Sequence, residues 1–246
     1  MMEKRCLCTI ILAAGKGTRM KSDLAKVLHP LCGKPMLTYS VDIARAVGSE
    51  KIVVIIGYQA SLIRKAFRDE GLIFVEQREQ LGTGHAVLQA QESFHDYNGT
   101  ILILCGDVPL LRPSTVLALF EYHISENSVV TVLTATHDNP SGYGRVVKGE
   151  KGEVLRIVEE RDATGEEKKV REINSGIYCV ESKFLFEAAA EIGRANTQKE
   201  YYLTDIVEIA CRKGQPVRSF TVSELHEVMG INTPDDLKKA GRLVTT

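Results

Sequence analysis

Short apolar runs rich in β-branched residues alternate with amphipathic stretches along this 246-residue chain, and this alternation limits the possible folds more than any other feature. It is typical of βαβ units, in which parallel strands form a sheet and helices cover both faces. Ligands of such sheets bind outside the carboxyl ends of the strands. The expected strands are Thr9–Ala13, Ile52–Ile56, Ile73–Val75, Ile101–Leu104, Val129–Thr134, Ile173–Val180 and Val217–Phe220; the expected helices are Met36–Val47, Ala60–Phe67, Gly84–Phe94 and Pro113–Ser125. The sequence therefore predicts an α/β fold with a mainly parallel sheet.

The middle of the chain departs from this alternation. Residues Gly142–Ala163 contain two alternating runs around a turn at residues 149–152, which predicts an antiparallel hairpin inserted beside the sheet edge as a wall of the pocket. Farther along, Thr233, Pro234 and Asp236 have the spacing of an N-cap, a first helical position and a capping box. No internal repeat, low-complexity segment or Pro/Ser-rich linker occurs, so we expect residues 1–246 to form a single domain.

Charge and cysteine usage exclude several classes of protein. With 31 basic and 32 acidic residues the net charge is -1, so no global field attracts nucleic acid or a membrane surface. No apolar run approaches the ~18 residues that a membrane-spanning helix needs. The six cysteines form no C-x-x-C pair and have no histidine at zinc spacing, and the six histidines are scattered. We therefore expect reduced cysteines in a soluble, cytoplasmic protein.

The N-terminus allows two interpretations. Lys4 and Arg5, followed by the apolar run Cys6–Ala14, resemble a signal peptide with a short hydrophobic core. A buried first strand that runs into a working loop explains the same residues and also the positive charges after Ala14. The second interpretation accounts for more of the sequence.

The loop after this strand is rich in glycine and positive charge. Within TIILAAGKGTRMKSDLAKVL (residues 9–28), Lys16, Arg19, Lys21 and Lys26 form a local cluster in a nearly neutral protein. No P-loop motif is present, and the dinucleotide motif G-x-G-x-x-G fits only at its first two glycines. Two possibilities remain open. Backbone N–H groups could hold a triphosphate while Arg19 and a lysine neutralise it, or the segment is a turn with solvated basic residues.

A carboxylate follows the fourth expected strand. In LCGDVPL (residues 104–110), Gly106 permits close approach and Asp107 is expected at the same sheet edge as the basic loop. Such a carboxylate can bind Mg²⁺ together with substrate phosphate oxygens, or it can accept hydrogen bonds from its own turn. A second glycine-rich turn, Glu79–Ala86, precedes a helix and could present backbone groups to the flat edge of a base.

Together these motifs resemble those of the sugar-1-phosphate nucleotidylyltransferase family, and within it the uridylyltransferase domains of bacterial bifunctional N-acetylglucosamine-1-phosphate uridylyltransferase/glucosamine-1-phosphate acetyltransferases. The similarity covers essentially the whole chain. Eight motifs occur in the family's order: LAAGKGTRM (12–20), KVLH (26–29), QLGTGHA (80–86), GDVPL (106–110), GYGR (142–145), IVEERDAT (157–164), EINSGIY (172–178) and EYYLTD (200–205). The resemblance implies a Rossmann-like nucleotidyltransferase fold and Mg²⁺ as cofactor.

The resemblance also implies a role for each matching position. The implied catalytic residues are Arg19, which would hold the departing pyrophosphate, Lys26, which would contact the reacting phosphates, and Asp107, which with Asn232 would ligate Mg²⁺. The nucleotide would be bound by Leu12, Ala13, Ala14, Gly15, Gln77, Gly82, Thr83, Cys105 and Gly106, and uracil by Gln77, Gly82 and Thr83 among them. The amino sugar would be bound by Gly144, Glu159, Asn174, Tyr202 and Thr204. Without the resemblance, Asn174 and Asn232 are turn residues with satisfied amides.

Three positions depart from the family pattern. Ala25 stands where proline is common, which predicts a less rigid approach to Lys26. Cys105 replaces a tyrosine and Ser175 a threonine, and these replacements leave the sugar selectivity open. The bifunctional family members continue into a left-handed β-helix of hexapeptide repeats that binds acetyl-CoA and forms trimers. No such repeat occurs in this sequence, from which we expect no acetyltransferase activity and a monomer or weak dimer.

The activity that the resemblance implies is uridylyl transfer from UTP to N-acetylglucosamine-1-phosphate. The products would be pyrophosphate and UDP-N-acetylglucosamine, a peptidoglycan precursor for cell wall biogenesis. A sugar-phosphate oxygen would attack the α-phosphorus in line, without a covalent intermediate or a general base. The alternatives are a thymidylyl-, cytidylyl- or guanylyltransferase of the same fold, and a non-catalytic module that binds sugar nucleotides. The presence of Arg19, Lys26 and Asp107 argues against the module.

Overall fold

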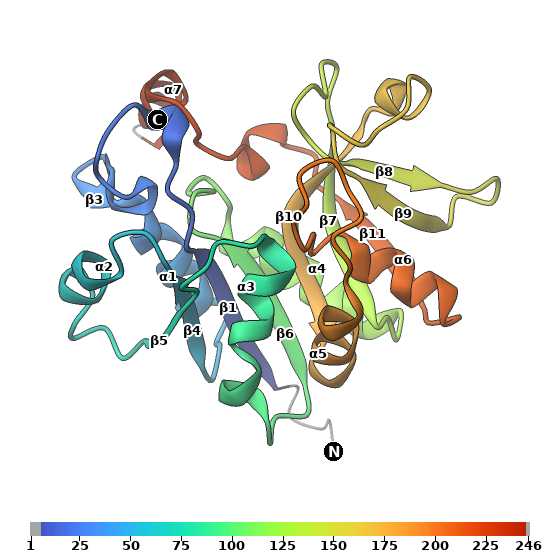
Figure 1. Ribbon diagram of the computed structural model, residues 1–246, viewed down its shortest axis with the longest axis horizontal. Coiled ribbons are helices and arrows are strands. Elements are labelled where there is room, and N and C mark those ends of the chain that lie inside the picture. The colour runs from blue at the N-terminus through green and yellow to red at the C-terminus, as the bar shows by residue number, and fades with distance from the viewer. Residues whose placement is uncertain (1–5, 245–246) are drawn as a thin grey trace.

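The computed structural model describes residues 6–244 and contains a central sheet with helices on both sides (Figure 1). Seven strands form its main path in the order β11-β7-β10-β6-β1-β4-β5. Their bounds are β1 Leu7–Ala13, β4 Ile52–Ile56, β5 Ile73–Glu76, β6 Thr100–Cys105, β7 Val130–Thr136, β10 Glu172–Glu181 and β11 Val217–Thr221. All seven expected strands are confirmed. Lys4 and Arg5, on which the signal-peptide interpretation began, lie outside the described residues, whereas the apolar run after them forms β1.

The strand pairing is mainly parallel, as the alternation predicts. β1 pairs in parallel with β4 and β6, β4 with β5, and β11 with β7. β10 is the exception, because it runs antiparallel between β6 and β7. A parallel connection needs a crossover, usually a helix, that returns the chain to the other end of the sheet. Residues 137–171 instead form a hairpin, and Glu172 at the start of β10 pairs with Thr136 at the end of β7.

The predicted hairpin consists of β8 (Arg145–Lys148) and β9 (Val154–Val158). Arg145 pairs with Ile173 at the start of β10, beside the carboxyl end of β7, so the hairpin stands at that edge of the sheet and is attached to an inner strand. The register of β10 against β7 shifts between Asn174 and Tyr178. This irregularity separates the first residues of β10 from the regular ladder, and the hairpin projects from there beyond the sheet (Figure 1).

Two hydrophobic cores lie on opposite faces of the sheet, because successive side chains of a strand point to opposite sides. In β1, Ile10 belongs to one core and Ile11 to the other, and both are fully buried. Residues of α3 (Thr83–Gln89), α5 (Ser182–Glu191) and α6 (Asp205–Arg212) pack into the first core, and residues of α1 (Met36–Ala46), α2 (Ala60–Ala66) and α4 (Pro113–Ser125) into the second. Helices on both faces are therefore confirmed.

Two details of the helices differ from the prediction. The expected helix Gly84–Phe94 divides into α3 and a 3-10 turn at Gln91–Phe94. Helices α5 and α6 are additional, since the sequence pattern did not resolve them from the loops around them. Within residues 6–244, no helix is long and apolar enough to cross a membrane, and no disulfide joins the cysteines.

The last helix, α7 (Pro234–Val244), begins as the sequence predicts. The Thr233 N–H donates to Asp236 Oδ2 (2.9 Å), and the Asp236 N–H donates to Thr233 Oγ1 (3.1 Å), which is a reciprocal capping box. The Asn232 N–H donates to the same Asp236 oxygen (3.1 Å). The cap therefore fixes the backbone of Asn232 as well as the start of the helix.

Candidate active site

The basic loop and Asp107 leave the sheet side by side. β1 and β6 are parallel neighbours in which Leu12 lies opposite Cys105, and the Gly106 N–H donates to the Leu12 carbonyl oxygen (2.9 Å). The Ser40 hydroxyl of α1 donates to the Cys105 carbonyl oxygen (3.0 Å) and holds the end of β6 from the other side. The expectation that the loop and the carboxylate share one edge of the sheet is confirmed.

A cavity of about 330 Å³ opens at this edge. It is lined by ten of the residues implied to bind phosphate or nucleotide: Leu12, Ala13, Ala14, Gly15, Lys26, Gln77, Gly82, Thr83, Cys105 and Asp107. Val27, Gln80, Ala86 and Glu200 complete the wall. Burial raises the pKa of the Cys105 thiol to about 12, so this side chain is a neutral wall residue, which donates to the Gly176 carbonyl oxygen at 3.4 Å.

One polar cluster joins the loop, the end of β6 and the segment before α7. Lys26 Nζ donates to Asp107 Oδ2 and also to Asn232 Oδ1, the latter at 2.9 Å. The Arg19 guanidinium donates to the same amide oxygen at 2.9 Å. The side chains of Lys26 and Asp107 are only 14% and 22% exposed, so water screens their attraction less than at the open surface. Two cations and two oxygen acceptors from distant parts of the chain thus converge beside the cavity.

The backbone holds Lys26 from two directions. Gly17 has φ +68°, and a Cβ there would lie 2.5 Å from Lys26 Cβ, so glycine alone lets the loop fold over the lysine stem. On the other side, Gln59 Oε1 accepts from the Ala25 N–H (2.8 Å), and Gln59 Nε2 donates to the Asp23 carbonyl oxygen (2.8 Å). Proline at position 25 would lack that N–H. Ala25 therefore permits a tether to the start of α2 that the commoner family residue could not form.

The second glycine-rich turn is clamped by Tyr201. The Tyr201 N–H donates to the Leu81 carbonyl oxygen, and the Tyr201 carbonyl oxygen accepts from the Gly84 N–H, each at 2.8 Å. Gly82 has φ +114°, and a Cβ there would lie 2.5 Å from the Tyr201 oxygen. The Leu203 N–H donates to Thr83 Oγ1 (3.0 Å). The motifs QLGTGHA and EYYLTD, far apart in sequence, thus form one hydrogen-bonded unit.

Four of the five residues assigned to the amino sugar gather where the hairpin meets β10. The Asn174 N–H donates to the Gly144 carbonyl oxygen (2.9 Å), and Glu159 Oε1 accepts from the Thr204 hydroxyl (3.3 Å). A Cβ on Gly144 would lie 3.5 Å from Asn174 Cβ and 3.6 Å from Glu159 Oε1, so these groups are in close contact. Burial, and after it the nearby carboxylates, raise the pKa of Glu159, although the Thr204 hydroxyl opposes the shift.

Tyr202, the fifth of these residues, belongs to a separate network. Its hydroxyl donates to Asp162 Oδ2 (3.1 Å) and accepts from Gln198 Nε2 (2.9 Å). Burial raises the pKa of the Tyr202 phenol to about 12. Tyr202, Asp162 and Asp205 line a hollow of about 440 Å³ that adjoins Glu159. The Tyr202 hydroxyl thus contacts Asp162 and Gln198 rather than the Gly144 group.

A further hollow of about 410 Å³ separates the basic loop from the hairpin. Arg19 and its neighbour Thr18 line one side, and residues 159–161 line another. Arg145 of β8 is 2% exposed, and its guanidinium donates to Glu160 Oε2 (2.6 Å). This ion pair, between a buried arginine and a partly exposed glutamate, joins β8 to the segment after β9 on the hairpin side of the hollow.

A comparison of the sequence with known families decides which family the chain belongs to. The sequence profile described as nucleotidyl transferase matches residues 8–225, a span that includes both glycine-rich turns, Asp107 and the hairpin. This chain belongs to the nucleotidyl transferase family. The fold of this transferase is also similar to that of a solved UDP-glucose pyrophosphorylase complexed with UDP-glucose, with a TM-score of 0.77 over 98% of each chain. At 18% sequence identity, that likeness concerns the fold.

Curated bacterial relatives of this transferase are named bifunctional protein GlmU. The protein of Geotalea daltonii is 49% identical over 239 residues, which are 97% of this chain and 52% of the relative. That of Geobacter metallireducens is 51% identical over 96% of this chain and 50% of its own length, and that of Clostridioides difficile 47% identical over 96% and 51%. The chain spans about half the length of the curated relatives it matches.

Three residues of this nucleotidyl transferase support the site although the sequence analysis assigned them no role. His85 lies in the motif QLGTGHA and Asp162 in the motif IVEERDAT, so a polar side chain within a family motif could have indicated a role for each. Gln59 carries no such signal, because its partners Asp23 and Ala25 come from another loop and meet it only in the folded chain.

Proposed function

We propose that this chain transfers a uridylyl group from UTP to N-acetylglucosamine-1-phosphate in the cytoplasm, forming UDP-N-acetylglucosamine and pyrophosphate. The observation that carries the proposal is the single cavity of about 330 Å³ that the second glycine-rich turn, the basic loop and Asp107 line together. Such a cavity can hold a flat base at the glycine-rich turn while the triphosphate of the same nucleotide reaches the charged side chains. The eight matching motifs and the similarity to GlmU proteins support this choice of substrates.

The proposed binding roles follow the positions of the side chains. Gln77, Gly82 and Thr83 bind uracil, and residues 12–15, Cys105 and Gly106 line the rest of the nucleotide. The group of Gly144, Glu159, Asn174 and Thr204 binds the amino sugar, and Tyr202 supports that group from the Asp162 network. Since the Leu203 N–H is bonded to the Thr83 hydroxyl, the base site and the sugar site share one scaffold.

The residues present fit a magnesium ion. Among residues 6–244, no three His, Cys, Asp or Glu side chains gather as a metal cage. However, the Asp107 carboxylate and the Asn232 amide oxygen converge on one cation, which in this structure is the Lys26 ammonium. Mg²⁺ prefers few protein oxygens and takes its remaining ligands from water and phosphate. Asp107 and Asn232 would therefore hold it, and when bound it would neutralise phosphate charge.

The chain's own charges account for the proposed reaction. One oxygen of the sugar phosphate attacks the α-phosphorus of UTP, the bond from that phosphorus to the bridging oxygen breaks, and pyrophosphate leaves with the electron pair. The nucleophile is already ionised, so no side chain needs to remove a proton. The barrier comes from bringing anions together and from charge that grows on the leaving oxygen. Lys26 neutralises the first charge from a partly dehydrated position in the cavity, and Arg19 neutralises the second from the exposed hollow beside it.

A coupled assay of pyrophosphate release tests the proposal. The purified chain is supplied with Mg²⁺, UTP and N-acetylglucosamine-1-phosphate, and in parallel with TTP, CTP or GTP and with other sugar-1-phosphates. We expect turnover with the first set and far less with the others. Turnover confined to another nucleotide or sugar phosphate would reassign the substrates, and binding without turnover of any pair would indicate a sugar-nucleotide-binding module.

Asp107→Asn is the matched variant for the metal assignment. It keeps the size of the side chain but removes its charge, so we expect turnover to fall by about 10² or more, because several kcal/mol of charge stabilisation are lost. Titration of Mg²⁺ in the same assay is the measurement. Normal rates of Asp107→Asn at saturating Mg²⁺ would contradict the assignment.

A further inference from the structure

The amide of Gln77, at the back of the cavity, has a fixed orientation. Gln77 Nε2 donates to the Gly82 carbonyl oxygen (2.9 Å) and lies 3.0 Å from His85 Nδ1. A carbonyl oxygen only accepts, so the Gly82 contact identifies the nitrogen end of the amide. A rotated amide would place Oε1 against that carbonyl oxygen, and the two would repel each other.

This orientation also assigns the protonation of His85. Because Gln77 Nε2 carries only hydrogens to donate, His85 Nδ1 must accept, and the ring then carries its proton on Nε2. Gln89 Nε2 lies 3.2 Å from that ring nitrogen but donates to the His85 carbonyl oxygen (3.3 Å), so it is a neighbour of the ring and not the acceptor of its proton. The ring is held in place by stacking on Tyr201, with centroids 6.1 Å apart. The Arg194 guanidinium lies over the Tyr201 ring, 5.5 Å from its centroid. His85 is thus a fixed acceptor rather than a rotating side chain.

The remaining atom of the amide, Oε1, is left for the cavity. Gln77 is 3% exposed and lines the cavity, and both of its N–H groups have partners within the protein. Its Oε1 has no hydrogen-bond partner among residues 6–244 and is not one of the enclosed polar atoms without a partner. Gln77 Oε1 is therefore a hydrogen-bond acceptor available to a molecule in the cavity.

We propose that His85 is a positioning residue that sets base selectivity by holding the Gln77 amide with its oxygen toward the nucleotide. This inference rests on the proposed function, in which Gln77 contacts the base. Uracil presents a donor at N3, which an amide oxygen can accept, whereas cytosine presents an acceptor at N3, which the same oxygen repels. A site that bonds an N–H of its substrate rejects the analogue that lacks it. His85 therefore makes the site selective for uracil over cytosine without touching either base.

The test compares kcat/KM for UTP and for CTP in the full chain and in His85 variants. We expect the unaltered chain to prefer UTP by about 10² or more. His85→Leu and His85→Ala remove the acceptor and free the amide to turn, so the preference should fall about tenfold or more, chiefly through a higher KM for UTP. His85→Asn, whose side-chain oxygen can take the place of Nδ1, should keep the preference. His95→Leu, at an exposed histidine away from the cavity, is the control and should change neither value.

The Gln77→Leu background gives a second measurement, which distinguishes action through Gln77 from a purely structural role of His85. If His85 acts through Gln77, His85→Leu should leave the UTP-to-CTP ratio unchanged when Gln77 is already leucine. Thermal unfolding shows which variants are folded, and His85→Ala gives the comparison if His85→Leu is not. An unchanged ratio in folded variants that lack the acceptor, or an equal loss with both nucleotides, would overturn this inference alone. Absence of UTP turnover in the unaltered chain would overturn the proposed function itself.

Discussion

At the scale of single residues, Lys26 determines the charge arrangement of the site. Its ammonium donates to the side-chain oxygens of both Asp107 and Asn232, and its stem lies beneath Gly17. Gln59 fixes the backbone just before it through the Ala25 N–H. The backbone is therefore held while the flexible side chain can exchange a protein oxygen for a phosphate oxygen. That combination suits a residue whose contact strengthens as the reaction proceeds.

Replacement of Lys26 should affect turnover more than binding. We expect Lys26→Ala to lower kcat by ~10² or more while UTP binding weakens less, because a charge contact in a partly dehydrated site is worth most in the transition state. Lys26→Arg should restore only part of the rate, since a planar guanidinium does not replace a compact ammonium. Steady-state kinetics and a separate binding titration measure the two effects.

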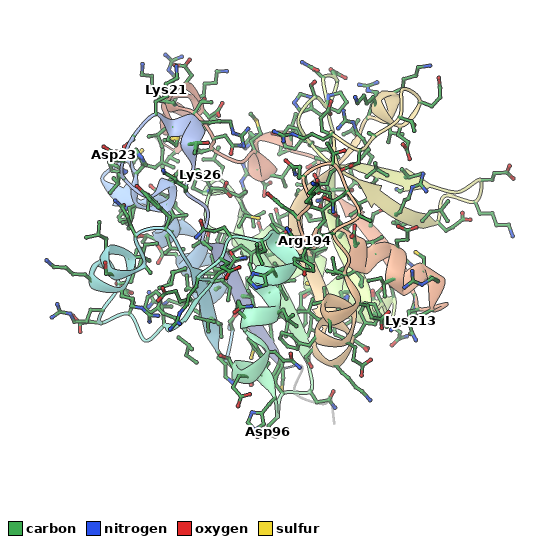
Figure 2. The ribbon with its side chains drawn as sticks, in the orientation of Figure 1. Lys21, Asp23, Lys26, Asp96, Arg194 and Lys213 are labelled. Atoms are coloured by element: carbon green, nitrogen blue, oxygen red, sulfur yellow. The ribbon has the colours of Figure 1, made fainter. Side chains whose placement is uncertain are left out.

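Lys21 of the same loop is the control for this prediction. It is exposed, and Figure 2 shows it on the outer part of the loop, whereas Lys26 lies closer to the sheet. Lys21→Ala should have near-normal kinetics. If kcat fell strongly in Lys21→Ala and stayed normal in Lys26→Ala, the phosphate assignments along this loop would be wrong.

Asp205, at the start of α6, predicts a pH dependence of stability. Burial, and after it the carboxylates of Glu208 and Asp162, raise the pKa of Asp205 to about 6, although the N-terminus of a helix favours a carboxylate. Because the folded state binds the Asp205 proton more tightly than the unfolded state, protonation favours folding. This contribution to the free energy of unfolding is fully present below about pH 4, the ordinary pKa range of Asp, and is lost as the pH rises through about 6. At neutral pH the folded chain therefore carries a destabilising charge on the half-buried Asp205 side chain.

Asp205→Asn should relieve that cost. We expect its free energy of unfolding to exceed that of the unaltered chain by about 1–2 kcal/mol at pH 7.5, and the gain to disappear below about pH 4. Urea unfolding at a series of pH values is the measurement. Asp235→Asn, at an exposed acid in the first turn of α7, should give no such pH-dependent gain. A gain that is the same at every pH would mean that charge is not its cause.

At the scale of elements, the connection between the turn before α3 and the segment before α6 is the main coupling in the site. Two backbone–backbone hydrogen bonds, and a third from the Leu203 N–H to the Thr83 hydroxyl, hold these two segments together. Gly84 N–H, Tyr201 N–H and Leu203 N–H all take part, so neither segment can move far without the other. A substitution in the turn should therefore change the KM values of both substrates.

Gly82→Ala tests this coupling. Its Cβ would clash with the Tyr201 backbone at a positive φ, so we expect a loss of more than about 2 kcal/mol of stability and higher KM values for both UTP and the sugar phosphate. Gly71→Ala is the matched control, because Gly71 has φ +65° with nothing within 4 Å of the added Cβ. It should show the smaller cost of an added Cβ at a positive φ without a clash, with normal KM values. Equal effects of the two variants would contradict the coupling.

At the scale of the whole molecule, apolar surface is distributed rather than gathered. Among residues 6–244, the large hydrophobic side chains that stay exposed lie on separate elements, such as Leu62 on α2, Leu117 on α4 and Leu155 on β9. Leu243 and Val244 adjoin at the end of α7. Stable self-association usually requires a contiguous apolar patch, and isolated exposed residues do not form one.

We therefore expect the 246-residue chain to sediment as a monomer of about 27 kDa at micromolar concentration, at most in weak equilibrium with a dimer. Analytical ultracentrifugation over a range of concentrations measures this directly. A stable trimer of this chain would contradict the prediction and would point to an interface that includes the exposed apolar residues Leu243 and Val244 of α7.

The sequence by itself determined the layered α/β fold, seven strands, the hairpin and the capping box at Thr233. These features depend on local periodicity and turn chemistry, which neighbouring residues specify. The same local order places Asp107 and the basic loop directly after buried strands, so their shared edge could be predicted. The resemblance of the motifs supplied the remaining site residues, including Asn232.

Only the tertiary structure decided the antiparallel direction of β10 and the attachment of the hairpin to it. It also decided that Lys26 bridges Asp107 and Asn232, that Gln59 tethers Ala25, and that His85 orients Gln77. The strand arrangement and the Lys26 and Gln59 contacts join segments that are distant in sequence, whereas Gln77 and His85 are brought into contact by the local turn before α3. Their geometry depends on how the layers pack and on how the turn is clamped, and periodicity along the chain carries no information on either. Hydrogen bonds and ion pairs then select one arrangement, because a buried polar group without a partner is costly.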